Sequence, residues 1–159
     1  MAAPTLLALL LLAPALAEEP RTEREPGPFR IRTVDGPLTT ETAGDRGVTA
    51  VHGRSVTQTL SWEPLVGPLT TAAYAQLAMI RDSASATAAS LATDGFVHPA
   101  TVAGRPAVQW TATVGPTAFV GAAVDCPRAR VLLVTAGQNE SAVARIHGHS
   151  LDSLDCSVR

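Results

Sequence analysis

The sequence has no lysine, few aromatic side chains and few charged residues. Its 12 basic residues are all arginines, its aromatics are two Trp, one Tyr and three Phe, and charged residues make up 16% of the 159, against about 25% in an average soluble chain. With 14 acidic residues the formal net charge is −2, which gives no electrostatic reason to expect binding to nucleic acid or to an anionic membrane. No apolar run after residue 17 approaches the roughly 20 residues of a membrane-spanning helix, and the length suits a single domain.

Residues 1–17 (MAAPTLLALLLLAPALA) have the pattern of a signal peptide. An apolar run begins at Leu6 and ends before Pro14, and a small-x-small triplet precedes Glu18. Because no Arg or Lys precedes the run, an uncleaved anchor is the alternative, but about ten apolar residues are too few to span a bilayer. We expect cleavage between Ala17 and Glu18 and a secreted or periplasmic protein. No Cys lies at the cleavage site, so no lipid anchor is expected there.

The two cysteines, Cys126 and Cys156, are expected to form a disulfide. An even pair in an oxidising compartment favours a bridge. The alternatives are two buried free thiols or half of a metal site, and the spacing between them is unlike that of a zinc site. By the loop-entropy relation such a bridge would stabilise the fold by roughly 3–4 kcal/mol.

The segment after the leader, residues 18–28 (EEPRTEREPGP), is rich in charge and proline and has no large apolar side chain. We expect it to be a disordered tether, because it cannot bury enough surface to offset its ordering entropy. Residues 29–159 would then form one domain. It begins with three strands that follow apolar alternation, at residues 29–34, 48–52 and 56–62.

A helix capped by Thr71 and running to about residue 93 comes next, with an apolar stripe rich in alanine. A meander of four strands follows, at residues 96–102, 106–114, 118–126 and 130–136. Asn139 is expected to cap a final helix, in preference to serving as a glycosylation acceptor in Asn139-Glu140-Ser141. Short turns make neighbouring strands antiparallel. The predicted fold class is α+β, with a single curved antiparallel sheet of about six to seven strands and two helices packed on it.

This order of elements resembles the PsbP-like fold superfamily, which includes a photosystem subunit, a nuclear Ran-binding regulator and bacterial envelope accessory proteins such as DcrB. The resemblance lies in a hairpin closing at 59–64 (TLSWEP), the turn at 102–107 (VAGRPA), and a strand at 131–135 that leads to a helix ending in 154–156 (LDC). It covers about residues 29–156. It implies a small accessory module, usually non-enzymatic, and it carries over no functional residue.

Metal-binding candidates are confined to His147, His149 and Asp152 near the C-terminus. Two residues apart on a helix, the two imidazoles would diverge, whereas His149 and Asp152 could share a face. His147 lies on the apolar stripe and can equally be a core residue. Trp62 and Trp110 share the phase of apolar neighbours, which favours core packing over ligand stacking.

No catalytic residue or cofactor is predicted, since there is no G-x-S-x-G elbow and no Gly-rich phosphate loop. We therefore expect an exported, non-catalytic binding or accessory module, monomeric or weakly oligomeric, that contacts a protein or envelope component. The alternative is an exported hydrolase or metal-binding protein that uses some of the four histidines. The polar row Gln109, Thr111 and Thr113, opposite the apolar phase of its strand, is the possible binding face.

Overall fold

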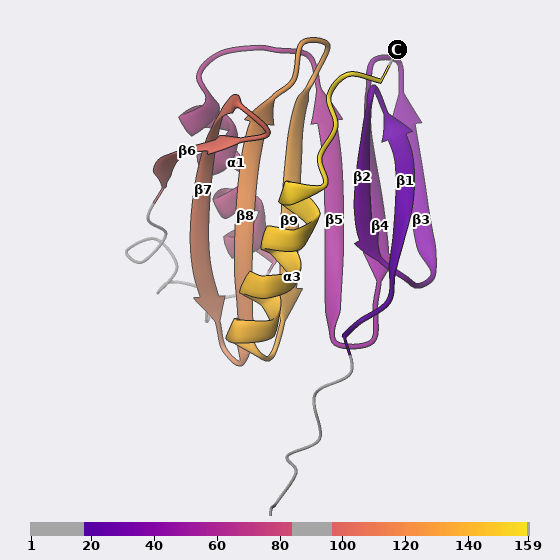
Figure 1. Ribbon diagram of the computed structural model, residues 1–159. Coiled ribbons are helices and arrows are strands. Elements are labelled where there is room, and N and C mark those ends of the chain that lie inside the picture. The colour runs from indigo at the N-terminus through magenta and orange to yellow at the C-terminus, as the bar shows by residue number, and fades with distance from the viewer. Residues whose placement is uncertain (1–17, 84–96, 159) are drawn as a thin grey trace, which may run out of the picture.

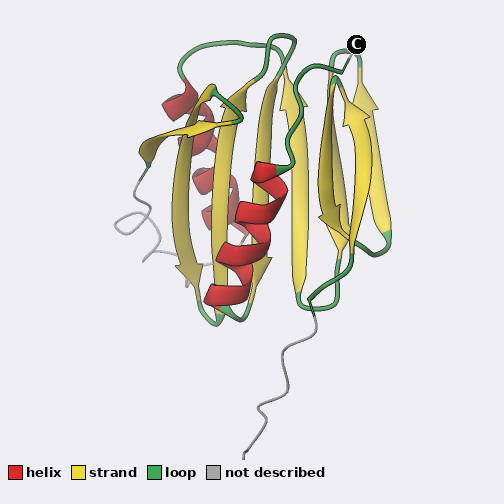
Figure 2. Cartoon of the chain, in the orientation of Figure 1, coloured by secondary structure: helices red, strands yellow, loops and turns green. Residues whose placement is uncertain are grey.

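A computed structural model describes residues 18–83 and 97–158, and its main feature is a seven-stranded antiparallel sheet (Figure 1). A separate two-stranded sheet and two helices pack against it (Figure 2). The large sheet has the strand order β3 (Leu38–Ala43), β4 (Arg46–His52), β5 (Val56–Glu63), β9 (Arg130–Gly137), β8 (Thr117–Asp125), β7 (Arg105–Val114) and β6 (His98–Val102). The remaining elements are β1 (Arg21–Gly27), β2 (Phe29–Val34), α1 (Leu69–Ser83) and α3 (Glu140–Asp152).

The predicted α+β class and the antiparallel meander are confirmed. Strand β3 was not predicted, because all six of its side chains are exposed and its sequence, LTTETA, has no apolar alternation. The first helix begins at Leu69, so Thr71 lies inside it and does not cap it. The signal peptide, the predicted helix beyond Ser83 and the start of the strand at Phe96 lie outside the described residues. Within the described residues, no helix is long and apolar enough to cross a membrane.

The two helices cover opposite faces of the large sheet, with α3 in front of it and α1 behind in Figure 1. Helix α1 packs its small residues Ala72 and Ala73 close to Trp110 on β7. Its buried Gln76 accepts a hydrogen bond from the Trp110 indole N–H at 3.1 Å. The small alanines of α1 therefore leave space for the large Trp110 indole on β7. Trp110 is fully buried, as predicted.

Helix α3 packs on β8 and β9. Asn139 caps it as predicted, with its side-chain oxygen accepting from the Ala142 N–H at 3.0 Å. The buried side of the helix consists of Val143, Ile146, His147, Ser150 and Leu151. These buried side chains dock α3 on the large sheet.

Residues 18–28 are not a disordered tether: they contain β1, which pairs with β2 along Arg21–Gly27. Composition alone does not show that β2 lies beside this segment and supplies its hydrogen bonds. The segment makes its contacts through backbone pairing and charged side chains, such as the Arg24 guanidinium, which donates to Thr33 Oγ1 at 2.8 Å. Pro26 falls where the register shifts, so its missing N–H interrupts no regular ladder.

The β1–β2 hairpin covers the front of β4 and β5 and brings a second core with it. Phe29 on β2 is fully buried and meets Trp62 on β5 edge to face, with ring centroids 6.0 Å apart. Gly27 and Gly47 lie against the Trp62 indole, where a Cβ atom would approach it to 2.9 and 2.3 Å. The absence of a side chain at both glycines is therefore what allows Trp62 to lie between the two sheets.

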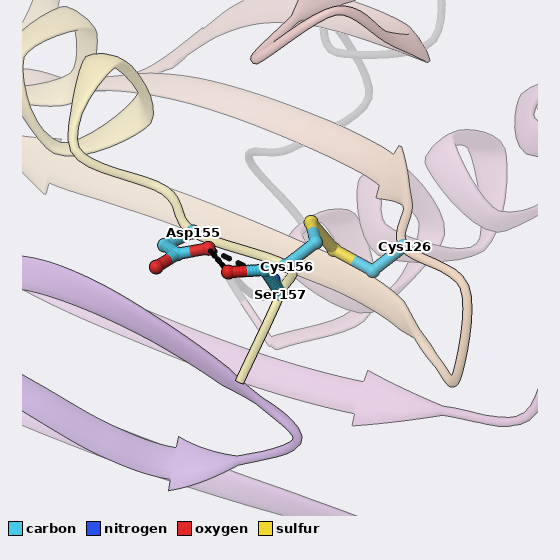
Figure 3. The surroundings of a disulfide bond; sticks show 4 residues. All are labelled: Cys126, Asp155, Cys156 and Ser157. Atoms are coloured by element: carbon cyan, nitrogen blue, oxygen red, sulfur yellow. Dashed lines mark hydrogen bonds between the residues drawn. A yellow bond between two sulfur atoms is a disulfide. The ribbon is translucent and has the colours of Figure 1, made fainter. Parts of the chain in front are cut away.

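A disulfide joins Cys126, at the end of β8, to Cys156, beyond α3, with the Cα atoms 5.4 Å apart (Figure 3). The Asp155 carboxylate accepts hydrogen bonds from the backbone and hydroxyl of Ser157 at 2.8 and 2.5 Å. The C-terminal segment is thereby fixed against the end of the large sheet.

Candidate functional site

Two polar surfaces flank α3 on the front of the molecule. On one side is the row Gln109, Thr111 and Thr113 on β7, which we call the polar row. On the other side is a cavity of about 470 Å³ between the β1–β2 hairpin and the end of α3, which we call the charged cavity. The charged cavity is lined by Arg21, Glu23, Arg30, Arg32, His149, Asp152, Ser153 and Asp155.

The polar row lies on an open part of the sheet. Val108, Trp110 and Ala112 point the other way and are buried beneath α1. Because α3 packs on β8 and β9, β7 lies to one side of it (Figure 1). Thr111 and Thr113 are exposed and Gln109 is half-buried. The row is therefore not covered by either described helix.

The strand neighbouring the polar row contributes apolar side chains. On β8, Thr111 pairs with Val120, and Thr113 pairs with the buried Ala118. A partner lying on this face would meet hydroxyl groups with an apolar border along α3.

The charged cavity is lined by three arginines and three carboxylates. Arg30 lies 2.5 Å from Glu25 and 3.5 Å from Glu23, and Arg32 lies 3.8 Å from Glu23. The hydrogen bond to Glu25 raises the pKa of Arg30, and the hydrogen bonds from Ser157 lower the pKa of Asp155. These side chains are exposed, so each pair adds little to stability. The mixed charge does not select a simple anion or cation.

The three metal-binding candidates are not brought together. His147 is buried, with 2% of its surface exposed, and faces the sheet. His149 and Asp152 line the charged cavity on the same side of the helix, as their spacing suggested. Among residues 18–83 and 97–158, no group of three or more His, Cys, Asp or Glu side chains is placed to hold a metal ion.

The histidine ring of His147 sits in a buried polar network between α3 and the sheet. Its Nδ1 lies 3.1 Å from Thr135 Oγ1, and the Gln58 amide donates to both Thr135 and Ser150. The Gln58 carbonyl oxygen accepts from the Val34 N–H at 2.8 Å. Burial lowers the pKa of His147 to about 4, so the ring is neutral near pH 7. A neutral, enclosed imidazole suits packing rather than proton transfer at a surface.

Sequence reasoning missed Gln58, although its position carries a signal. In β5 the buried residues alternate as Val56, Gln58, Leu60 and Trp62, so an amide occupies an inward position of a strand. A polar residue in an apolar phase indicates a buried hydrogen-bond partner.

A second buried polar group missed from the sequence is Arg130. Its guanidinium donates to the Asp125 carboxylate at 2.6 and 3.1 Å. It also donates to the carbonyls of Val66, Gly67 and Pro68. These bonds fix the loop between β5 and α1, on which the Val66 side chain is 72% exposed.

No model of a known protein family matches the chain, and no curated protein matches its sequence. Among solved structures it is similar to the solution structure of cyanobacterial PsbP (CyanoP) from Synechocystis sp. PCC 6803. That similarity has a TM-score of 0.55 at 10% identity and covers 87% of this chain and 92% of that one. The chain therefore has a PsbP-like fold, which confirms the resemblance drawn from its turns and element order.

Proposed function

We propose that this chain is an exported, non-catalytic accessory module that binds a protein or another component of the cell envelope. The observation that carries the proposal is the PsbP-like fold over most of the chain. That fold is associated with accessory proteins that act by contact rather than by catalysis. The placement of His147 supports a structural role for the most enclosed histidine.

The Cys126–Cys156 disulfide supports export. Disulfides persist in secreted, periplasmic and other oxidising environments and are rare in the cytosol. The leader pattern at residues 1–17 points to the same compartment.

The polar row supports the binding part of the proposal. A partner laid on β7 would contact the exposed Thr111 and Thr113 without disturbing the core beneath α1. The threonine hydroxyl groups can form hydrogen bonds with a partner, and the apolar border can exclude water from the contact. Protein interfaces combine a polar rim and an apolar centre in this way.

Intact-mass measurement on the chain recovered from the extracytoplasmic fraction tests export. The proposal expects a chain that begins at Glu18 and contains no free thiol. A chain recovered in the cytosol with residues 1–17 attached and both thiols free would refute it.

Co-purification from the envelope fraction tests binding. The proposal expects a stoichiometric partner that is retained by wild type and lost by the double variant Thr111→Arg, Thr113→Arg. The matched control is Ala75→Arg, an exposed position on α1 that should retain the partner.

An activity abolished by His→Ala at His52, His98, His147 or His149 would favour the hydrolase alternative.

A further inference from the structure

The outer edge of β3 is an open strand edge. Within residues 18–83 and 97–158, β3 is the terminal strand of the large sheet, and its one strand partner is β4. All six of its side chains are exposed, including Leu38 at 47%. An edge strand carries a row of backbone N–H and C=O groups that can pair with another chain.

One backbone hydrogen bond shows which residues of β3 bond to β4 and which direct their backbone groups outward. The His52 N–H donates to the Pro37 carbonyl at 3.0 Å, so these two residues form a hydrogen-bonded pair. In an antiparallel ladder such pairs recur at every second residue. Thr39, Glu41 and Ala43 therefore direct their backbone groups to β4. The outward groups belong to Leu38, Thr40 and Thr42.

The other edges of the described sheets are protected in ways that β3 is not. Strand β6, at the opposite end of the large sheet, contains the exposed Pro99, which has no N–H. Strand β1 contains Pro26 and alternating charges. The open side of β2 is covered by Asp155, which exchanges backbone hydrogen bonds with Arg30. Proline and charge are the usual protection of edges, and within β3 only Glu41 is charged.

We propose that β3 pairs antiparallel with β3 of a second copy of this chain, with Thr40 opposite Thr40 of that copy. In this register Leu38 faces Thr42 of the second copy, and Thr42 faces its Leu38. All three outward residues then form hydrogen-bonded pairs, giving about six backbone hydrogen bonds across the two-fold axis. The two large sheets become one continuous sheet.

The position of the one charge in β3 favours this register, and a second copy of β3 is an occupant that pairs all three outward residues. With Thr40 at the axis, Glu41 faces Thr39 of the second copy, and no two charges meet. Moving the axis to Glu41 would place two carboxylates directly opposite, which is destabilising, and would leave about four backbone hydrogen bonds. β3 can therefore pair with its own sequence without placing like charges opposite each other.

The test is sedimentation of the folded chain over a range of concentrations, with Thr40→Pro and Thr40→Val compared. Both variants lose the Thr40 hydroxyl, which lies 3.0 Å from the Thr49 hydroxyl. Only Thr40→Pro also removes the outward N–H, and the ladder to β4 does not use that group. We expect a concentration-dependent dimer in wild type and in Thr40→Val, and at least about tenfold weaker dimerisation in Thr40→Pro. A wild-type chain that stays monomeric, or a dimer that Thr40→Pro leaves unchanged, overturns the proposal.

Crosslinking provides a second measurement that does not depend on the folding of the proline variant. Hydrogen-bonded pairs place their Cα atoms about 5.5 Å apart, within the range of a disulfide. Thr40→Cys should therefore form a covalent dimer under mild oxidation. In the same register the two Thr42 residues are about 14 Å apart, so Thr42→Cys, on the same edge, should not. Equal crosslinking of the two variants, or capture of a different protein by Thr40→Cys in place of its own copy, contradicts this assignment.

Discussion

Asp155 and Cys156 are consecutive residues that fasten the C-terminal segment to two different parts of the fold. Asp155 exchanges two backbone hydrogen bonds with Arg30 on β2, each 2.8 Å long. Cys156 is bonded to Cys126 at the end of β8. The small sheet, the large sheet and the end of α3 are therefore connected through two adjacent positions.

Removing the disulfide should destabilise this junction. We expect Cys156→Ser to lower the free energy of unfolding by roughly 2–4 kcal/mol, because the reduced chain regains loop entropy when it unfolds. Hydrogen exchange should show loss of protection first in the last turn of α3 and in residues 153–157. The double variant Cys126→Ser, Cys156→Ser should be no less stable than the single variant. Unchanged stability in denaturant titrations would show that the bridge contributes nothing.

Stability should depend on pH through His147. The pKa of the His147 imidazole is about 4 in the folded chain, against an ordinary value of 6.5. Between pH 4 and pH 6.5 the unfolded chain therefore binds one more proton at this residue than the folded chain does. The free energy of unfolding is therefore highest above about pH 6.5 and falls by about 3 kcal/mol as the pH approaches 4. Urea titrations of His147→Phe should lack this decline, whereas His149→Ala, at an exposed position, should retain it. The same slope in both variants would assign the decline to other groups.

Gly121→Ala should disturb the core beneath α1. A Cβ atom there would lie 2.0 Å from the Trp110 indole, so the ring must move and lose its bond to Gln76. We expect a loss of roughly 1–3 kcal/mol and a shift in tryptophan fluorescence. Gly148→Ala is the matched control, because its Cβ would meet nothing within 4 Å and should stabilise α3 by up to about 1 kcal/mol. Equal effects of the two changes would refute the packing argument.

Arg130→Lys should weaken the loop between β5 and α1. An ammonium cannot reproduce the planar set of donors that the guanidinium directs to Asp125 and three carbonyls. We expect a loss of roughly 2–4 kcal/mol by thermal or denaturant unfolding. Arg128→Lys, two residues away and exposed, should change stability by less than about 0.5 kcal/mol. If the two substitutions behaved alike, the buried contacts of Arg130 would have little energetic weight.

The strands with apolar alternation and the cap of α3 were predictable because local chemistry determines them. Apolar alternation identified β5 and β7, and the short side-chain oxygen of Asn139 identified the start of α3. The phase of Trp62 and Trp110 was enough to place both in the core.

What could not be predicted depends on partners distant in the sequence. β1 is a strand because β2 supplies its hydrogen bonds, and no periodicity within residues 18–28 shows this. The space for Trp62 comes from Gly27 and Gly47, and the environment of His147 comes from Gln58 and Thr135. Strand phase alone predicts that the polar row faces away from Trp110. Its exposure depended on where α3 lies, which the sequence does not determine locally.

The most direct test of the proposed function is hydrogen exchange on the chain alone and on the chain bound to the component that it captures from the envelope. The account predicts new protection across β7 and the adjoining part of β8, around Thr111 and Thr113, while the amides of α1 on the opposite face are unchanged. Protection confined to α1, or no captured component in the presence of an intact Cys126–Cys156 bridge, would contradict it.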